Sequence, residues 1–398
     1  MRTLLPLLAV MAGWVFVEQP GYAATQVVAW GAGTYVASPA DLFNFGQSIV
    51  PAGQTNAAQV AAGWQHSLAL NANGTLTGWG GDSVHQTDFL PVGATDFVAV
   101  ACGELHSLAL RADGSVAVAG DNTYGAISVP GNLTNAVAIA CGFYHSLALK
   151  SDGTLAAWGG QNYLGVTVDY GQGRVPAGLS NIVAIAAGAY HNLILRRDGT
   201  VLAWGLDSAG QTDIPAGLSN VIAVAAGAEH DVVLKADGTL SAWGANEYGQ
   251  TNIPAGLSNV VAITVGGWHT LALKRDGTVV AWGSGAGSNA YVDFGQNLVP
   301  AGLSNVVQIS AGKLNSLALV GNGPPVTRGW LNHPALGTNG FSFQLQPAQY
   351  GRVYQLEFAG VFTGGAWQSL PLSAGTGGSL RWTNPASMPQ RFYRVQQW

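Results

Sequence analysis

The sequence predicts an all-β protein: a seven-bladed β-propeller that is closed by its N-terminal strand and followed by a small C-terminal β-sandwich. Three observations lead to this prediction. A short motif recurs seven times at intervals of 39 to 46 residues, each copy lies between runs typical of short strands, and the first and last repeats are incomplete in complementary ways. Repeats of this length are typical of propellers and solenoids.

The repeated motif is a glycine followed three residues later by a histidine, and then by a short apolar run. The histidines are His66, His106, His145, His191, His230 and His269, and Asn315 stands in the seventh slot. Zinc needs three or four ligands that converge to about 2.0–2.3 Å, whereas these six residues occur once per repeat. We therefore predict that they are structural, each bonding a neighbouring loop within its own blade, and that they bind no metal.

Each repeat has the pattern of four short antiparallel strands. One unit contains three apolar runs, at residues 220–226, 230–235 and 239–243. An Asp-Gly pair, Asp237-Gly238, separates the second run from the third. An Asp-Gly pair between apolar runs favours a tight hairpin turn, because both central residues need positive φ. Each unit is expected to contain a fourth strand as well. An example is the segment at residues 211–215, where the proline suits an edge position. Four such strands in about 40 residues describe a propeller blade.

The two ends of the repeat array predict how the ring closes. Each unit ends in a strand with Trp-Gly or, once, Ala119-Gly120, and the first of these strands, residues 26–30, has no histidine-type strand before it. The last histidine-type strand in turn has no Trp-Gly strand after it. The N-terminal strand should therefore complete the sheet begun by residues 306–319, which removes open sheet edges.

Residues 1–23 are typical of an export signal. Arg2 precedes an apolar run at residues 4–17, and Gly21-Tyr22-Ala23 suits cleavage after Ala23. The run is short for a membrane span, although a retained anchor is the alternative. No later stretch is apolar enough to span a bilayer, so we expect a mature chain that is secreted or held in the cell envelope, in the periplasm or at the cell surface.

Residues 24–323 form the predicted propeller, and residues 324–398 form the predicted sandwich. Pro324-Pro325 marks the linker, after which alternating apolar runs replace the repeat. The C-terminal segment has five arginines against Glu357 alone, whereas the propeller has nine basic and 18 acidic residues. The basic segment either touches an anionic envelope or is a spacer with a solvated charge bias.

Composition argues against nucleic-acid binding and leaves open whether the two cysteines form a disulfide. Charged residues make up only 9% and the net charge is −5, which argues against a nucleic-acid binder. Cys102 and Cys141 occupy the same place in adjacent repeats, just before the motif glycine. They form a disulfide only if this position lies near the propeller axis, and otherwise they are small buried thiols.

A family resemblance follows from these strings. The pattern Gly-x-x-His-Ser-Leu-Ala-Leu-x-x-Asp-Gly-Thr-x-x-x-Trp-Gly resembles the regulator of chromosome condensation repeat, a seven-bladed propeller family. The short period, the opening residues 27–31 and the string at residues 249–254 resemble more closely the secreted bacterial propellers that inhibit β-lactamases. The resemblance covers about residues 25–323. It implies binding of a partner enzyme through one loop face.

No catalytic motif is legible in the sequence. A Gly-x-Ser-x-Gly elbow, a His-Glu-x-x-His pair and a phosphate-binding loop are all missing, and His85 and His333 stand alone. We predict a protein that is not an enzyme and that needs no cofactor.

The variable loops give the functional prediction. Strand direction places the Gly-x-x-His turns and the loops after Trp-Gly on one face, and the Asp-Gly turns on the other. The first face has the variation and the aromatic side chains: Trp64, Phe143, Tyr144, Tyr190, Trp268, Tyr124, Tyr163, Tyr170, Tyr248, Tyr291 and Phe294. Aromatic anchors on loops are typical of protein interfaces. We predict a monomer that binds a partner protein there, with two alternatives: carbohydrate binding or action on polysaccharide in the cell envelope, and a regulator resembling guanine-nucleotide exchange factors.

The sequence also suggests where on this face the partner binds. Counting blades from the one closed by Trp30, Trp64 falls on blade 2 and Trp268 on blade 7, with Leu314 between them. Long excursions at residues 31–50 and 284–299 flank the same closing blade. Tyr144 and Tyr190 bracket a third excursion, residues 160–175, and are expected on the opposite rim.

Overall fold

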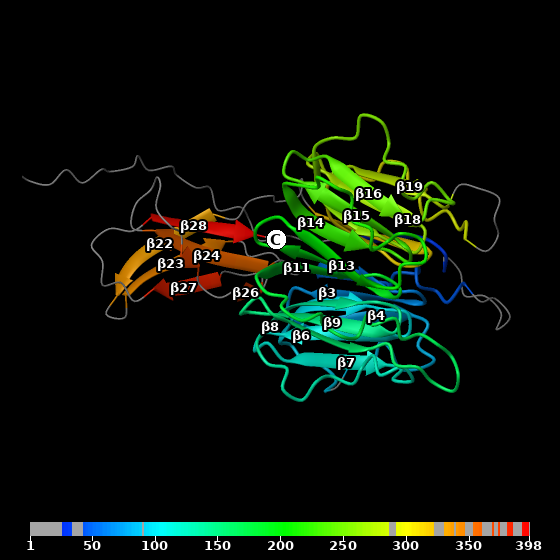
Figure 1. The fold of residues 1–398 in the computed structure, drawn as a ribbon, viewed down its shortest axis with the longest axis horizontal. Coiled ribbons are helices and arrows are strands. Elements are labelled where there is room, and N and C mark those ends of the chain that lie inside the picture. The colour runs from blue at the N-terminus through cyan, green and yellow to red at the C-terminus, as the bar shows by residue number, and fades with distance from the viewer. Residues whose placement is uncertain are drawn as a thin grey trace, which may run out of the picture.

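The computed structural model describes residues 26–33, 43–89, 91–285 and 292–321, and the backbone of the strands between 330 and 397. Seven three-stranded antiparallel sheets form the propeller, and two further sheets follow them in sequence (Figure 1). Within these described ranges no helix forms, so none is long and apolar enough to cross a membrane.

The blades are numbered from the one that holds both ends of the propeller. Blade 1 combines β20 (Val306–Ala311), β21 (Asn315–Val320) and β1 (Gln26–Gly31). The next three blades are β2 (Ala57–Ala62), β3 (His66–Asn71), β4 (Leu76–Gly80); β5 (Phe97–Cys102), β6 (His106–Arg111), β7 (Val116–Gly120); and β8 (Ala136–Cys141), β9 (His145–Lys150), β10 (Leu155–Gly159). The last three are β11 (Ile182–Ala187), β12 (His191–Arg196), β13 (Val201–Gly205); β14 (Val221–Ala226), β15 (His230–Lys235), β16 (Leu240–Gly244); and β17 (Val260–Val265), β18 (His269–Lys274), β19 (Val279–Gly283).

Closure by the N-terminal strand is confirmed. β1 pairs antiparallel with β21 over six residues, from Gln26 opposite Val320 to Gly31 opposite Asn315. The Trp30 indole is 6% exposed and donates a hydrogen bond of 2.8 Å to the carbonyl of Gln296. Blade 1 is therefore built from the two ends of the repeat array.

The prediction of a fourth strand in each blade is wrong. The segment after the Trp-Gly strand forms turns and extended backbone instead, as at Gln211–Pro215. The Gln211 side chain is fully buried and accepts a hydrogen bond from the amide of Ala209, and the amide of Ile214 bonds the carbonyl of Thr212. The amides of Thr212 and Asp213 are likewise bonded, to Asp207 and to the carbonyl of Gly210. Because Pro215 has no N–H, no amide of residues 212–215 is left to form a ladder with the outer strand.

The core lies between neighbouring blades. The leucines of each middle strand are inaccessible to solvent, and Leu108 and Leu110 of blade 3 pack in one cluster with Ala148 and Trp158 of blade 4. Each blade thus buries its apolar face against the next one, as a repeat that cannot form a core by itself must do.

The motif histidines are structural in a different way from the predicted one, because they join blades rather than loops within a blade. Each Nε2 lies within hydrogen-bond distance of the residue that follows the motif histidine or asparagine of the next blade. The pairs are His66–Ser107 at 2.7 Å, His106–Ser146 at 3.0 Å, His145–Asn192 at 2.8 Å, His191–Asp231 at 2.9 Å, His230–Thr270 at 3.1 Å and His269–Ser316 at 2.9 Å. Asn315 completes the ring with a contact of 3.5 Å to Ser67.

The direction of the histidine hydrogen bonds follows from a second hydrogen bond that the partner hydroxyl makes. The Ser146 hydroxyl donates to the carbonyl of Ala126 at 2.8 Å, so it must accept from Nε2–H of His106. The Trp158 indole donates to the same carbonyl at 2.8 Å. The histidine, hydroxyl and tryptophan positions of the repeat therefore converge on one loop carbonyl.

The motif glycine is fixed by close approach to the same histidine. A Cβ on Gly63 would lie 2.7 Å from the carbonyl oxygen of Gly103 in the next blade and 2.8 Å from Cε1 of His66. The glycines that follow in the other blades face the next glycine carbonyl in the same way, and Gly312 returns to Gly63. A closed ring of seven glycines thus surrounds the axis, where a side chain has no room.

The C-terminal strands form two antiparallel sheets. One contains β22 (Trp330–Gly337), β23 (Gly340–Gln346) and β27 (Leu380–Asn384). The other contains β24 (Val353–Ala359), β25 (Gln368–Ser369), β26 (Ser373–Ala374) and β28 (Phe392–Gln397). The predicted linker and the predicted signal at residues 1–23 lie outside the described residues, and the sandwich packing stays a prediction.

Closure predicts that β1 is essential for stability. A chain begun at residue 32 should melt at a lower temperature or associate, because β21 loses its partner and the buried Trp30 is removed, which alone costs about 3–5 kcal/mol. Thermal unfolding and sedimentation, compared with a chain begun at residue 24, test this. A monomeric shortened chain with an unchanged melting temperature would show that closure does not depend on β1.

The buried histidines predict acid lability. Burial lowers the pKa of His66 and His145 to about 4, and of His106, His230 and His269 to about 3, from 6.5. Between about pH 4 and pH 6.5 the unfolded chain therefore binds protons that the folded chain excludes. The contribution of these histidines to the free energy of unfolding is full above pH 6.5 and falls with acidification by about 1.4 kcal/mol per pH unit for each histidine.

A single substitution checks this slope. His106→Asn copies the residue that blade 1 uses at Asn315, so the hydrogen bond can re-form without a titrating ring. Urea unfolding from pH 4 to pH 6.5 should show a pH slope smaller by one proton than that of the unaltered protein. An identical slope would mean that His106 is protonated in the folded state.

Candidate functional site

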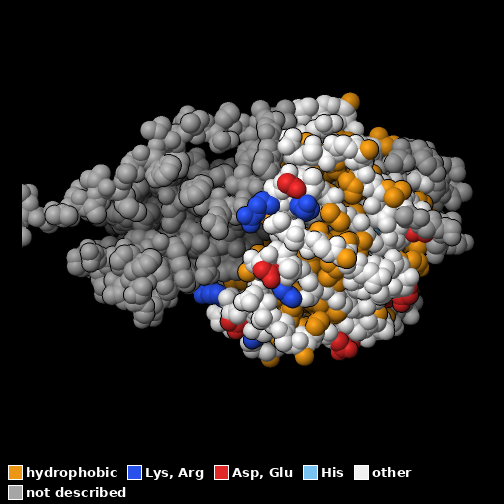
Figure 2. Space-filling model, turned by 90° about the horizontal axis from the view of Figure 1, so that it is seen from above, with side chains coloured by type: hydrophobic (Ala, Val, Ile, Leu, Met, Phe, Trp, Pro, Cys, Tyr) orange, Lys and Arg blue, Asp and Glu red, His pale blue; other side chains and the backbone are white. Residues whose placement is uncertain are grey.

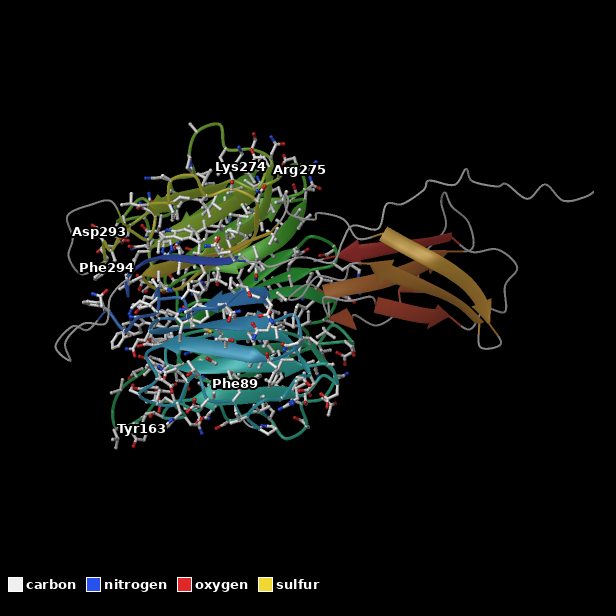
Figure 3. All side chains as sticks on the ribbon, turned by 180° about the vertical axis from the view of Figure 1, so that it is seen from behind. Phe89, Tyr163, Lys274, Arg275, Asp293 and Phe294 are labelled. Atoms are coloured by element: carbon white, nitrogen blue, oxygen red, sulfur yellow. The ribbon has the colours of Figure 1, made fainter. Side chains whose placement is uncertain are left out.

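One end of the propeller brings together the two kinds of loop that vary between repeats. The residue after each Trp-Gly strand donates a backbone hydrogen bond to the residue before the motif histidine, as Gly160 does to the carbonyl of Tyr144 at 2.6 Å. Tyr163, Asp293 and Phe294 lie at this end, and Lys274 and Arg275 lie toward the other (Figure 3). We call these ends the loop face and the turn face, and the predicted sharing of one face is confirmed.

Seven of the aromatic side chains on the loop face form one continuous aromatic cluster. Trp64 stacks on Phe143 with ring centres 5.8 Å apart, and Phe143 lies 5.9 Å from Tyr190. The remaining members extend the cluster outward through Tyr144, Tyr124, Tyr163 and Tyr170. Tyr144 and Tyr190 are therefore not on a rim opposite Trp64, because Phe143 connects them across the centre of the face.

Trp268, Tyr248 and Phe294 make no ring contact with this cluster. Trp268 pairs with Tyr248 at 6.5 Å between ring centres, and Phe294 pairs with Phe43 at 5.3 Å. Leu314, expected between Trp64 and Trp268 on the surface, is fully buried, and its neighbour Lys313 lies between the two tryptophans instead. Tyr291 lies outside the described residues.

The excursion at residues 160–175 exposes apolar side chains in a hairpin. Tyr163 and Val166 bridge across a tip formed by Leu164 and Gly165. Leu164 is 85% exposed and has a φ of +45°, which is uncommon for a residue other than glycine. Of the exposed large apolar side chains in the described part of the chain, five lie in this excursion: Tyr163, Leu164, Val166, Tyr170 and Val175.

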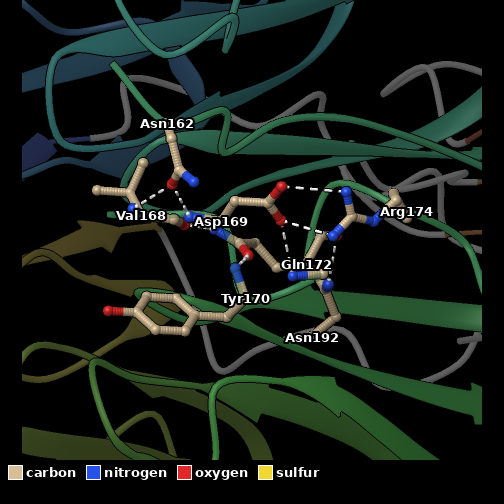
Figure 4. A network of polar contacts seen from close by, with 8 residues as sticks. Asn162, Val168, Asp169, Tyr170, Gln172, Arg174 and Asn192 are labelled. Carbon is tan, nitrogen blue, oxygen red and sulfur yellow. Dashed lines mark hydrogen bonds and ion pairs between the residues drawn. The ribbon is translucent and has the colours of Figure 1, made fainter. Parts of the chain in front are cut away.

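Polar contacts hold the base of this hairpin in place (Figure 4). The Asn162 side-chain oxygen accepts hydrogen bonds from the amides of Val168 and Asp169, both at 2.9 Å. Asp169 binds the Arg174 guanidinium through two contacts of 2.8 and 3.0 Å. The exposed tip is therefore carried on a fixed base.

The axial channel opens in the middle of the loop face. Each blade contributes the end of its inner strand, the motif glycine and, in most blades, the following residue, and these surround a cavity of about 70 Å³. Cys102 and Cys141 line this channel, so the condition set for a disulfide, a position near the axis, is met, but both are free thiols and the structure contains no disulfide between them. Burial raises the pKa of Cys102 to about 12.

A buried carboxyl group and a half-buried ammonium group influence each other at the channel mouth. Glu104 is 5% exposed, and burial raises the pKa of its carboxyl to about 7, against the opposing effects of Lys313 and a hydrogen bond from Tyr144. Burial lowers the pKa of Lys313 to about 8, with Glu104 opposing the shift. Neither residue was singled out from the sequence, because only the closed ring brings these two repeat positions together.

Charge is sorted along the propeller axis. Outside the masked loops, the loop face has ten acidic residues, which are Asp82, Asp88, Glu104, Asp121, Asp169, Asp207, Asp213, Glu229, Glu247 and Asp293, and only Arg174 and Lys313 as cations. The turn face has seven cations, which are Arg111, Lys150, Arg196, Arg197, Lys235, Lys274 and Arg275, against six aspartates. In Figure 2, Lys and Arg side chains gather toward one end of the propeller, and acidic side chains alone are seen toward the other.

One group of potential metal ligands, which the sequence did not predict, lies among the described residues. His85, which seemed isolated in the sequence, lies 3.0 Å from Asp88 and close to Asp82, with ligand atoms within 4.8 Å of one another. All three side chains are exposed, and His85 and Asp88 already form an ion pair. Three exposed groups of this kind do not form a closed coordination shell.

Sequence reasoning also missed a set of fully buried glutamines. The backbone carbonyls of Gln47, Gln250 and Gln296 accept hydrogen bonds from both the tryptophan and the hydroxyl positions. Gln47, for example, accepts from Trp79 and Ser67 at 2.9 Å each. The set is Gln47, Gln86, Gln172, Gln211, Gln250 and Gln296. The available signal was a glutamine, preceded by a glycine, that lies 19 residues before the motif histidine or asparagine in five of the seven repeats; Gln86 instead follows His85, and Ala126 stands in this position before His145.

Comparison with known proteins agrees with this geometry. The family model described as the regulator of chromosome condensation (RCC1) repeat matches residues 57–86, 97–126, 136–165, 182–211, 221–250 and 260–291. The chain belongs to the RCC1-repeat propellers. Six repeats match rather than seven, which fits a blade 1 that is divided between the two ends of the RCC1-repeat array.

Solved structures share the RCC1-repeat fold at low identity. Prp20p from Saccharomyces cerevisiae is 19% identical with a TM-score of 0.58, over 76% of this chain and 93% of that one. Human WBSCR16 is 19% identical with a TM-score of 0.56, over 75% and 98%. The CRINKLY WD40 ectodomain of the receptor kinase ACR4 from Arabidopsis thaliana is 17% identical with a TM-score of 0.50, over 65% and 91%. No curated protein sequence matched the chain.

The contacts of Asn162 predict how the exposed hairpin is held. Asn162→Ala should speed amide hydrogen exchange at Val168 and Asp169 about tenfold, because both amides lose their acceptor, while the free energy of unfolding changes by less than about 1 kcal/mol. Asn246→Ala, which removes the acceptor of the Thr251 amide in blade 6, is the control and should affect only its own loop. Unchanged exchange at both amides of the 160–175 hairpin would contradict the assignment.

Proposed function

We propose that the chain is an exported, non-enzymatic binding protein whose loop face binds a partner protein. The observation that supports this best is the hairpin tip. Leu164 exposes 85% of its surface in a backbone conformation that costs a residue with a Cβ about 1–2 kcal/mol, on a base fixed by Asn162 and Asp169. Stability alone favours Asn or Gly at such a tip, so an exposed leucine in this conformation indicates a contact with something outside the chain.

The aromatic cluster provides the rest of the binding surface. Tyr163 and Tyr170 are 48% and 40% exposed, and the cluster continues inward to half-buried Phe143 and Trp64. Tyrosine and tryptophan bury a large apolar area while keeping a polar group, which is why they dominate interface hot spots. Rigid anchors also lose little conformational entropy when they are bound.

Asymmetry favours one protein partner over many equal carbohydrate sites. The exposed apolar side chains concentrate in one excursion, and the residues before the motif histidines differ from blade to blade. A lectin built from repeats would present the same aromatic and polar set in each blade. Prp20p has been studied for its binding to Gsp1p and histones. An exchange-factor role fits this chain poorly if residues 1–23 direct export.

Inhibition of a partner enzyme is the most specific form of this proposal. A hairpin with exposed apolar side chains beside an aromatic cluster can cover the mouth of an enzyme's active site, and the resemblance to β-lactamase-inhibiting propellers motivates this form. Export and a place in the cell envelope or outside the cell rest on the apolar run at residues 4–17.

A pair of matched variants tests the loop face. The propeller, immobilised, is used to capture a partner from the secreted and envelope fractions of the native culture, and its Kd is measured with the purified partner. Leu164→Asn should weaken binding at least about tenfold without loss of stability, because asparagine tolerates positive φ but removes the apolar contact.

Val92→Asn is the control, because Val92 is 87% exposed but lies on the turn face. It should leave the Kd unchanged. Equal losses from both variants, or a loss from Val92→Asn alone, would place the binding surface elsewhere.

A further inference from the structure

The mouth of the axial channel is built unevenly. The residue after the motif glycine is large in blades 1 to 4, where it is Lys313, Trp64, Glu104 and Phe143. It is small in blades 5 to 7, where it is Ala189, Ala228 and Gly267. Large and small side chains are therefore unevenly distributed around the cavity of about 70 Å³, whose lining includes Trp64, Phe143 and Lys313 as well as Ala189, Ala228 and Gly267.

An ammonium group is already held between the aromatic rings of this mouth. Nζ of Lys313 lies 2.7 Å from the ring centre of Trp64, 5.1 Å from that of Phe143 and 5.5 Å from that of Trp268. Aromatic rings arranged in this way attract cations through their quadrupoles, and most strongly where water is excluded. We call these three rings the aromatic cage.

A buried carboxylate beside the cage has an unused oxygen. Oε1 of Glu104 accepts a hydrogen bond of 3.0 Å from the Tyr144 hydroxyl, whereas Oε2 has no hydrogen-bond partner among the described residues. Glu104 forms no ion pair with Lys313, although the two charges influence each other. A buried acceptor without a partner is costly, and the observation indicates a donor that is supplied from outside.

The surroundings favour a cation as that donor. The loop face has ten acidic side chains and two basic ones in the described residues, so its field attracts positive charge toward the mouth. Lys313 can leave the cage without unfolding, because its backbone amide, which bonds the carbonyl of Gly63, holds the chain while the long side chain turns outward.

We propose that the aromatic cage receives a lysine or arginine side chain of the partner protein, which displaces Lys313 and donates a hydrogen bond to Oε2 of Glu104. This inference rests on the proposed function, since it names the chemistry of the partner that the loop face binds. Lys313 holds the site in the free protein, and the partner's cation takes its place. The apolar hairpin contributes contact area at the rim, and the cage recognises charge at the axis.

The test measures binding of two small probes to the full chain by ligand-observed NMR. The probes are Nα-acetyl-lysine amide, whose only charge is on the side chain, and its neutral analogue Nα-acetyl-norleucine amide. Lys313→Ala should bind the lysine probe at least about tenfold more tightly than the unaltered protein, because the cage is vacated. Adding Glu104→Gln should abolish this gain. Lys313→Gln repeats the test if the alanine variant is unstable, and Lys274→Ala, on the turn face, should bind like the unaltered protein.

Three outcomes would overturn the inference. Equal binding of norleucine amide would show an apolar pocket without charge recognition. No gain on removal of Lys313 would show that the cage does not accept an external cation. Binding of Nα-acetyl-glutamate amide that is lost in Lys313→Ala would show that Lys313 is itself an anchor for anions.

The captured partner separates this inference from the proposed function. If the cage binds the partner's cation, Glu104→Gln should weaken partner binding at least about tenfold, and the affinity should fall as salt is raised. Sensitivity to Leu164→Asn without sensitivity to Glu104→Gln would leave the proposed function standing and refute the cation site.

Discussion

The hydrogen bond from each motif histidine to the next blade is the interaction on which the rest of the structure depends. It joins two sheets that share no backbone ladder, and it does so where both partners are fully buried, as at His106 and Ser146. It also explains the composition of the repeat. The glycine makes room for the imidazole, the hydroxyl passes the hydrogen bond to a loop carbonyl, and the tryptophan indole meets that carbonyl from the outer strand. A buried donor left without its acceptor is costly, so each of these positions constrains the others.

Because the ring is held from inside, the loops at one end are free to differ. The turn face keeps short hairpins in which aspartates accept hydrogen bonds from nearby hydroxyls, as Asp276 does from Thr278 at 2.6 Å. The loop face contains the hairpin at Tyr163–Val166 and the aromatic cluster. The buried histidine, glycine and tryptophan positions of the repeat stabilise the ring, and the loop-face positions are free to vary. The residue after the motif glycine can therefore differ from blade to blade, as Trp64 and Ala189 do.

The sequence predicts well whatever depends on spacing along the chain. The number of blades, the pairing of β1 with β21 and the sharing of one face by two loop types all follow from the positions of His66 to Asn315 and of the Trp-Gly strands. Contacts across the ring do not follow in this way. Trp64 stacks on Phe143 from two blades away because the inner strands converge on the axis, and the same convergence brings Glu104 near Lys313. The fourth strand was wrongly predicted because buried glutamines such as Gln211 satisfy the backbone that a ladder would otherwise use.

A buried carboxyl group at the channel mouth is unusual in a chain with so few charged residues. With 9% charged residues, most side chains at the axis are small and uncharged, such as Ala189 and Gly267. A carboxylate that is 5% exposed in such surroundings is costly, and its cost is reduced only by a nearby cation or by a donor. Lys313 supplies the cation at a distance, and Tyr144 supplies one donor, so one of the two carboxylate oxygens is left without a hydrogen bond. A fold that needed only a plug for its channel would be satisfied by another alanine, because the ring of histidine bonds closes the propeller without any contribution from Glu104. Buried Glu104 is therefore the observation from which the proposed recognition of a cation starts.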